Sequence, residues 1–276
     1  MATTLGAQAA ARLRSGTRNT RRRRPVARGM SETTSSTTTG SSRTLGIIGA
    51  GNIGSTLAKL AVDAGYDVVI ANSRGPETLA DLVAQLGPKV RAATAVEAAE
   101  AGDLVVVTVP LKAYRELPAA QLAGKVVLDT GNYYPDRDGR IAPLDERTAT
   151  TSGLVQEHLA DAQVVKAFNN IFFVALAQLG RPAGSADRSA LPVFGDDDAA
   201  KATAERFLDD LGYDAVDGGT LAESWRSENG RPVYVMPYAA DGDVSTPAPG
   251  SATTVRELLG RAVRDAADQQ VGAMPS

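Results

Sequence analysis

The sequence predicts an α/β fold: a doubly wound, mostly parallel sheet with a small C-terminal α/β extension. Short apolar runs, rich in β-branched residues, recur from Thr44 onward and are typical of buried parallel strands. Helical patterns lie between these runs, which favours βαβ units with right-handed crossovers. A glycine-rich turn follows the first run directly and opens the first helix. Together these features are typical of the Rossmann-type fold.

The predicted strands and helices alternate. Each apolar run is too short for a buried helix and too continuous for a half-exposed strand. The first helix is expected at 55–64 and the second at 77–86, where Gly87 and Pro88 end it. The strands are expected at 45–48, 68–70, 104–109, 126–128 and 164–165, followed by a strand at 191–194, a helix at 199–211 and a strand at 213–216.

Composition excludes several kinds of site. The chain has 276 residues, 43% of them apolar, with no cysteine and one histidine. It can therefore hold no disulfide, thiolate nucleophile or cysteine-ligated metal. His158 alone cannot build a multi-histidine metal site, so we expect no metal. Its place in a helix predicted at 154–159, away from any strand end, predicts a surface histidine and not a catalyst. No apolar run approaches the roughly 20 residues of a membrane span, and we expect a cytoplasmic protein.

The glycine-rich turn is the most specific motif. Gly49, Gly51 and Gly54 form a GxGxxG pattern between a strand and a helix, and a second strand begins near Asp67. In this context the three glycines would permit a tight turn, a close approach of the backbone to a pyrophosphate, and packing of the helix on the strand. The N–H groups at the helix start, around Asn52 and Ile53, would bind the anion. The motif predicts a dinucleotide site.

The end of the second strand indicates which dinucleotide binds. NAD sites place a carboxylate there to bind the ribose hydroxyls, but this strand ends in Asn72, Ser73 and Arg74. A guanidinium can hold a 2′-phosphate with paired hydrogen bonds, and a serine hydroxyl can add a donor. We therefore expect NADP(H) as the cofactor, with these three residues in its site.

Later strand ends should complete the pocket, because ligands of open α/β sheets bind beyond the carboxyl ends of the strands. Val109 and Pro110 would form an apolar wall beside adenosine or nicotinamide. Thr130 and Asn132 would hydrogen-bond a carboxamide or a ring carbonyl, and two tyrosines follow them. The segment 166–170 (KAFNN) ends the next strand and is expected to close the pocket.

Five segments carry a family resemblance. IIGAGNIGSTLA, ANSRGPETL, DLVVVTVP, VVLDTGNYYP and VVKAFNN occur in this order, and the chain resembles NADPH-dependent reductases of the deazaflavin coenzyme F-420 over about residues 44–240. It is similar, less closely, to the N-terminal domain of pyrroline-5-carboxylate reductases. The resemblance implies hydride transfer between NADPH and a deazaflavin. It also implies NADP binding by the residues named above at the glycine turn and at Ser73 and Arg74, with 109, 110, 130 and 132 near the nicotinamide.

The scarcity of acid–base residues fits hydride transfer to a deazaflavin, coenzyme F-420, or to a flavin, since no protein proton donor is obligatory. Two alternatives stay open. Reduction of a small imine or carbonyl would need a donor, for which Tyr133, Tyr134 and Lys166 are candidates. A non-catalytic NADPH sensor would need none. The sequence assigns no catalytic residue.

Three regions are expected along the chain. Residues 1–43 form an Arg/Ser/Thr-rich segment with nine arginines against Glu32 alone; it is expected to be disordered, and Met30 is a candidate start. Residues 44–240 form the NADP-binding domain, and 241–276 a linker and a helix near 253–268. The acidic remainder argues against nucleic acid, so the expected partner is a small-molecule redox acceptor, with no membrane. A homodimer is the oligomer considered.

Overall fold

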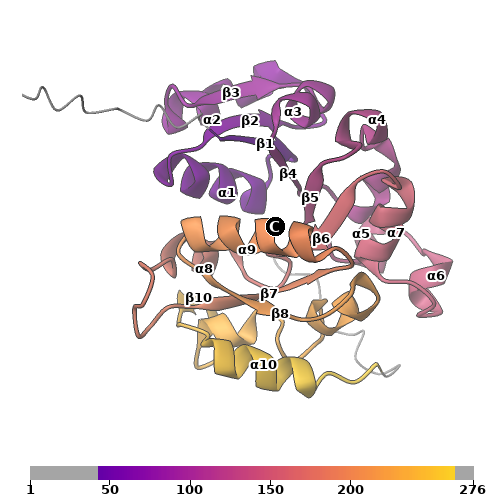
Figure 1. Cartoon of the computed structure of the whole chain (residues 1–276), viewed down its shortest axis with the longest axis vertical. Helices are drawn as coiled ribbons and strands as arrows, with labels where there is room; N and C mark the ends of the chain where they lie inside the picture. The colour runs from indigo at the N-terminus through magenta and orange to yellow at the C-terminus, as the bar shows by residue number, and fades with distance from the viewer. Residues whose placement is uncertain (1–42, 265–276) are drawn as a thin grey trace, which may run out of the picture. The chain divides into compact units, whose positions relative to one another are not determined.

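The computed structural model describes residues 43–264, and the predictions for residues 1–42 and 265–276 lie outside this range. Within it, one sheet has the strand order β3-β2-β1-β4-β5-β6-β7-β8 (Figure 1). The strands are β1 (Thr44–Ile48), β2 (Asp67–Ala71), β3 (Val90–Ala93), β4 (Leu104–Val107), β5 (Val126–Asp129), β6 (Gln163–Lys166), β7 (Ala190–Gly195) and β8 (Asp214–Asp217).

The order of the first six strands is the one that binds dinucleotides in Rossmann folds. All neighbours from β3 to β6 pair in parallel, and the strand order reverses between β1 and β4. β7 then pairs antiparallel with β6, and β8 runs parallel to β7. The predicted fold class is confirmed, including the small α/β extension after the parallel sheet.

The strand residues that point to either face of the sheet are apolar, and helices therefore cover both faces. One core packs β-strand residues such as Ile47 and Val106 against α1 (Asn52–Asp63), α8 (Phe173–Gln178) and α9 (Asp198–Asp210). The opposite core packs Ile48 and Val105 against α3 (Ala95–Ala101), α4 (Ala119–Leu122) and α7 (Thr151–His158). In Figure 1, β7 and β8 lie between α9 and α10 (Ala252–Gly260).

The remaining elements are short. Besides α2 (Ala80–Leu86), they are 3-10 helices, single helical turns and one hairpin. These are η1 (Pro76–Leu79), η2 (Leu111–Glu116), α5 (Pro135–Asp138), α6 (Ala142–Asp145), η3 (Leu221–Ser227), η4 (Met236–Tyr238), β9 (Ala239–Ala240) and β10 (Asp243–Pro247).

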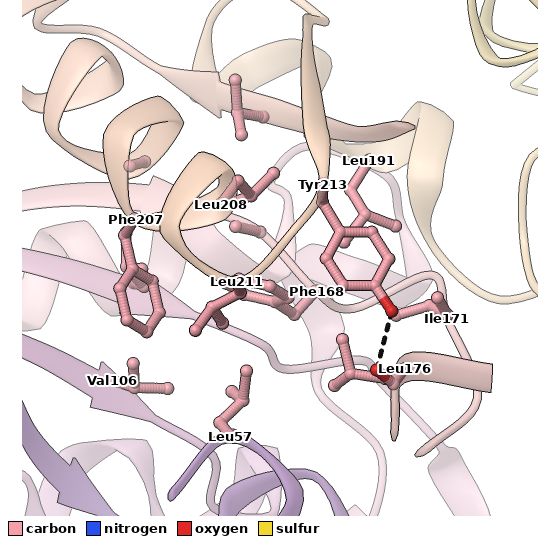
Figure 2. Close-up of a cluster of buried hydrophobic side chains, with 14 of the residues drawn as sticks. Leu57, Val106, Phe168, Ile171, Leu176, Leu191, Phe207, Leu208, Leu211 and Tyr213 are labelled. Atoms are coloured by element: carbon pink, nitrogen blue, oxygen red, sulfur yellow. Dashed lines mark hydrogen bonds between the residues drawn. The ribbon is translucent and has the colours of Figure 1, made fainter. Parts of the chain in front are cut away.

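Tyr213 joins the extension to the rest of the core. Figure 2 shows its ring among buried side chains, with its hydroxyl donating to the Leu176 carbonyl of α8 at 2.7 Å. Burial raises the pKa of Tyr213, so the hydroxyl keeps its proton. Replacing Tyr213 with phenylalanine should lower the free energy of unfolding by about 1–2 kcal/mol, because a buried carbonyl loses its donor. Urea unfolding measures this, and coincident curves for the two proteins would contradict it.

Two predicted features of the C-terminal region are wrong. The segment 241–250, predicted as a linker, contains β10, which pairs antiparallel with β9 and packs on α8. The last helix ends at Gly260, and Arg261–Arg264 are not helical. Glycine is a poor helix former. Beyond Gly260, the carbonyl oxygens of Val263 and Arg264 accept hydrogen bonds from the side chains of Arg231 and Arg147, respectively, and not from a further helical turn. No helix in residues 43–264 is long and apolar enough to span a bilayer.

Candidate functional site

The glycine turn packs directly against the end of β4. Gly49 has φ +115°, and a Cβ there would lie 2.3 Å from the Thr108 carbonyl oxygen. A Cβ on Gly54 would lie 2.0 Å from the Gly49 carbonyl oxygen. Neither position can hold a larger residue without moving backbone, so these glycines set the close approach of α1 to β1 and β4.

Gly51 differs from Gly49 and Gly54, the other two glycines of the motif. A Cβ there would meet nothing within 4 Å, and no side chain caps α1. The first internal bond of the helix runs from the Ser55 N–H to the Gly51 carbonyl. Within the described residues, the N–H groups of Asn52, Ile53 and Gly54 have no hydrogen-bond partner. Unpaired N–H groups at the positive end of a helix, with open space before them, suit a phosphate.

A cavity of about 1210 Å³ opens at this helix terminus, beyond the carboxyl ends of β1, β4, β5 and β6. Most of the predicted site residues line it: Gly51, Asn52, Ile53, Val109, Pro110, Thr130 and Asn132. Gly49 and Gly54 lie behind its wall in the turn. The cavity lies at the reversal of strand order, where ligands of such sheets bind.

The end of β2 lies outside this cavity. The Asn72 side chain accepts from the Arg74 N–H at 2.9 Å and donates to Thr78 at 2.8 Å, so it holds the loop in shape. Ser73 and Arg74 are exposed, and in residues 43–264 neither side chain has a hydrogen bond or an ion pair. The loop adjoins the glycine turn, because the Gly49 N–H donates to the Ala71 carbonyl. Both side chains are thus available to a ligand.

Asn132 lines the cavity and also takes part in a hydrogen-bond network that joins two strand ends. Its amide donates to the Asn169 carbonyl at 2.8 Å and accepts from the Asn169 amide at 3.1 Å. Ser227 donates to Asn169 at 3.0 Å, which adds η3 to the same network. The Asn132 amide group therefore ties the end of β5 to the end of β6, and one of its two N–H donors is already used. Within the described residues the Thr130 hydroxyl makes one hydrogen bond, to the Val107 carbonyl at 3.3 Å. Its oxygen can therefore still accept a hydrogen bond from a ligand.

The three candidate proton donors differ in their position relative to the cavity. Lys166 is fully buried below the cavity and donates to the Gly131 carbonyl at 2.8 Å and to Thr151 at 2.6 Å. The Tyr133 hydroxyl donates to Asp145 and accepts from the Ile141 N–H, away from the cavity. Only Tyr134 lines the cavity. Lys166 therefore supports the loop after β5 and has no access to a ligand there.

Sequence reasoning missed the segment 229–235, which forms another wall. The Tyr234 hydroxyl lies 2.5 Å from the Tyr134 hydroxyl. Burial, and then the neighbouring Tyr134, raise the pKa of Tyr234, so it stays protonated at neutral pH. Val235 and Phe168 both line the cavity in the left-handed region, with φ 62° and 61°. That conformation is rare for a β-branched residue and gathers at ligand sites. No motif marks this segment in the sequence.

His158 takes no part in the site. It is half-buried, its Nε2 lies 3.0 Å from the Leu117 carbonyl oxygen, and its ring packs edge-on against Tyr114. The surface position predicted for it is therefore wrong in degree, because α7 presses the ring onto η2. Within the described residues no group of acidic or histidine side chains could hold a metal ion.

The strand order, the open helix terminus and the cavity beyond it define the class of protein, an NAD(P)-dependent oxidoreductase. Residues 44–133 match the family described as NADP oxidoreductase coenzyme F420-dependent. A hypothetical protein, SMa0349 from Sinorhizobium meliloti, is 32% identical with a TM-score of 0.61, and the match covers 70% of this chain and 93% of that one. The chain belongs to this family, which confirms the resemblance seen in its motifs.

Two further relatives are informative in different ways. The structure of a "putative F420 dependent NADP-reductase" from Arthrobacter sp. FB24 is 27% identical with a TM-score of 0.57, covering 67% of this chain and 87% of that one. The protein YjhV of Escherichia coli K12 is 39% identical over 59 residues, which are 21% of this chain. The match with YjhV spans only 43% of that protein's length.

Proposed function

We propose that this protein transfers hydride between NADPH and a deazaflavin such as coenzyme F-420, or a flavin-like acceptor. The observation that carries the proposal is the size and lining of the cavity. Its volume of about 1210 Å³ exceeds the roughly 300–1,000 Å³ typical of a site for one small ligand. Such a space suits two ring systems held face to face.

The cofactor half of the site would be held by backbone and by the β2 loop. The unpaired N–H groups of α1 and the open space at Gly51 fit a pyrophosphate. The side chains of Ser73 and Arg74, which have no partner in the described chain, fit a 2′-phosphate. When bound, NADPH supplies the hydride. The residues of this chain bind and orient, and we assign no catalytic residue among them.

The acceptor half would be held by apolar walls. Val109 and Pro110 after β4 face the same cavity as Phe172, Phe173 and Val235. These side chains would exclude water and hold a planar ring against the nicotinamide, which gives proximity and orientation without acid–base groups. Val109 and Pro110 follow β4, Phe172 and Phe173 lie at the start of α8, and Val235 lies in the segment after η3.

An acceptor screen tests the proposal. Anaerobic NADPH oxidation would be followed with coenzyme F-420, FMN and a cyclic imine at equal concentration. We expect the deazaflavin or the flavin to react at least about tenfold faster than the imine, a difference of about 1.4 kcal/mol in barrier. Oxidation by the imine alone would contradict the proposal, and NADPH binding without any turnover would favour a sensor.

The Tyr134–Tyr234 pair supports a second candidate, reduction of an imine or carbonyl, because both residues line the cavity and their hydroxyl groups are hydrogen-bonded to each other. General acid catalysis contributes about 10²–10⁴-fold. If the protein reduces an imine or carbonyl, Tyr234→Phe should lower the turnover of that substrate by about 10²–10⁴-fold. If it reduces a deazaflavin, the same substitution should change turnover by less than about threefold. Tyr66→Phe is the matched control, since its hydroxyl bonds to Asp210, outside the residues that line the cavity.

A further inference from the structure

A second, smaller cavity lies beside the first. It has a volume of about 60 Å³, and its walls include Trp225 and three arginines, Arg147, Arg231 and Arg264. One water needs roughly 10–15 Å³ on this measure, so the space suits a few waters or one small oxyanion. Asn229 lines both cavities, which places the arginines next to the acceptor half of the large one.

The arginines are held by backbone groups. Arg147 donates to the Arg264 carbonyl at 2.8 Å, and Arg264 donates to the Ala149 carbonyl at 3.0 Å. Arg231 donates to the Val263 carbonyl. The guanidinium carbons of Arg231 and Arg264 lie 5.3 and 5.7 Å from the centre of the Trp225 ring. Arg147 and Arg264 each use one of their five side-chain N–H donors on these bonds, and the bonds fix both guanidinium groups at the cavity wall.

No carboxylate of residues 43–264 forms an ion pair with Arg147 or Arg264. Glu228 is the acidic residue in the wall, and its Oε1 accepts from the Thr151 hydroxyl at 2.7 Å and lies 3.7 Å from the Lys166 ammonium. Its charge is therefore already shared with Lys166.

The backbone at Arg147 is also unusual. Arg147 follows α6 with φ 60°, the left-handed conformation that glycine usually adopts after a helix. A non-glycine residue there costs free energy, and such positions gather at ligand sites. Here the conformation brings a half-buried guanidinium to the cavity wall.

We infer that this cavity binds a small oxyanion, a phosphate or carboxylate group, on Arg147 and Arg264. Planar guanidinium groups bind both kinds of anion through paired, charge-assisted hydrogen bonds. The anion is either free in solution or the terminal group of the acceptor's side chain reaching over Asn229. Only this second source rests on the proposed function.

Inorganic phosphate tests the site without turnover. Calorimetric titration at constant ionic strength, with no NADPH, should show saturable binding. The fluorescence of Trp225, the chain's one tryptophan, should change in parallel, because the Arg264 guanidinium over its ring would be drawn to the anion. Arg147→Gln and Arg264→Gln should each weaken binding by about tenfold or more. Arg256→Gln, which removes an exposed charge on α10, should leave binding unchanged.

Circular dichroism and thermal unfolding would first confirm that each variant folds. Absence of saturable phosphate binding to the folded wild type would overturn the inference, as would equal weakening by all three variants. The source follows from FMN and riboflavin, which share a ring and differ by one phosphate. If the acceptor supplies the anion, phosphate should compete with FMN and not with riboflavin, and Arg147→Gln should weaken FMN binding alone. If neither flavin binding responds while phosphate still binds, the anion comes from solution.

Discussion

Gly54→Ala should nearly abolish NADPH binding and also destabilise the fold. Its new methyl group would lie 2.0 Å from the Gly49 carbonyl oxygen and 2.9 Å from the Thr108 Cγ2. The nearer contact is with backbone, so α1 must move away from β1, at about 1–3 kcal/mol of unfolding free energy. A displacement of about 1 Å can cost on the order of a hundredfold in a positioned site. Calorimetry with NADPH and urea unfolding measure both effects.

Gly51→Ala is the matched comparison. Its methyl group would meet no protein atom within 4 Å, and its φ of −77° is open to alanine. The unfolding free energy should therefore stay unchanged, while NADPH affinity falls by about tenfold or more because the phosphate loses its close approach. Unchanged affinity in Gly51→Ala would mean that the cofactor does not use this turn. Loss of stability in both variants would leave no distinction between packing and binding glycines.

Local patterns explain how much of the fold could be predicted. Buried parallel strands are apolar on both faces, so their runs stand out, and the predicted strand 126–128 lies within β5 (Val126–Asp129). β3 lies outside every predicted range because an exposed Arg91 interrupts its apolar pattern. β10 is absent from the prediction for a related reason, since its residues are half-exposed or exposed. Both strands lack the continuous apolar run that burial on two faces imposes.

Part of the candidate site could be predicted from the sequence and part could not. The glycine turn could be found because motif, strand and helix are contiguous, and Gly51, Asn52 and Ile53 line the cavity. Tyr234 and Val235 could not, since they reach the cavity through contacts distant in the sequence. Asn170 donates to the Val233 carbonyl at 3.0 Å and accepts from the Val235 N–H at 2.8 Å. Nothing local in this segment indicates that pairing.

Trp225 lines the smaller cavity and not the large one. The guanidinium groups of Arg231 and Arg264 lie over its ring in this smaller cavity. Its fluorescence would report on an anion there before it reports on an acceptor ring.

Arg74→Ala should reduce NADPH affinity by roughly ten- to a hundredfold. Charge-assisted hydrogen bonds to a phosphate are worth about 1.5–3 kcal/mol, at about 1.4 kcal/mol per tenfold. The fold should be unaffected, because the Arg74 side chain has no partner in residues 43–264. Ser73→Ala combined with Arg74→Asp should weaken NADPH binding further, since a carboxylate repels the 2′-phosphate. Arg91→Ala, which removes an exposed arginine from β3, is the control for loss of charge alone.

The comparison with NADH separates phosphate recognition from a general effect. NADH carries no 2′-phosphate, so its affinity should change by less than about twofold in Arg74→Ala, within about 0.4 kcal/mol. The NADPH affinity should also fall more steeply with added salt in the wild type than in the variant, because Arg74 is exposed and its attraction is screened. Paired titrations of both cofactors at two salt concentrations measure this. Equal weakening of NADPH and NADH would instead assign Arg74 to the shared adenosine half, and Asn72, which shapes the same loop through Thr78, would then be the residue to vary next.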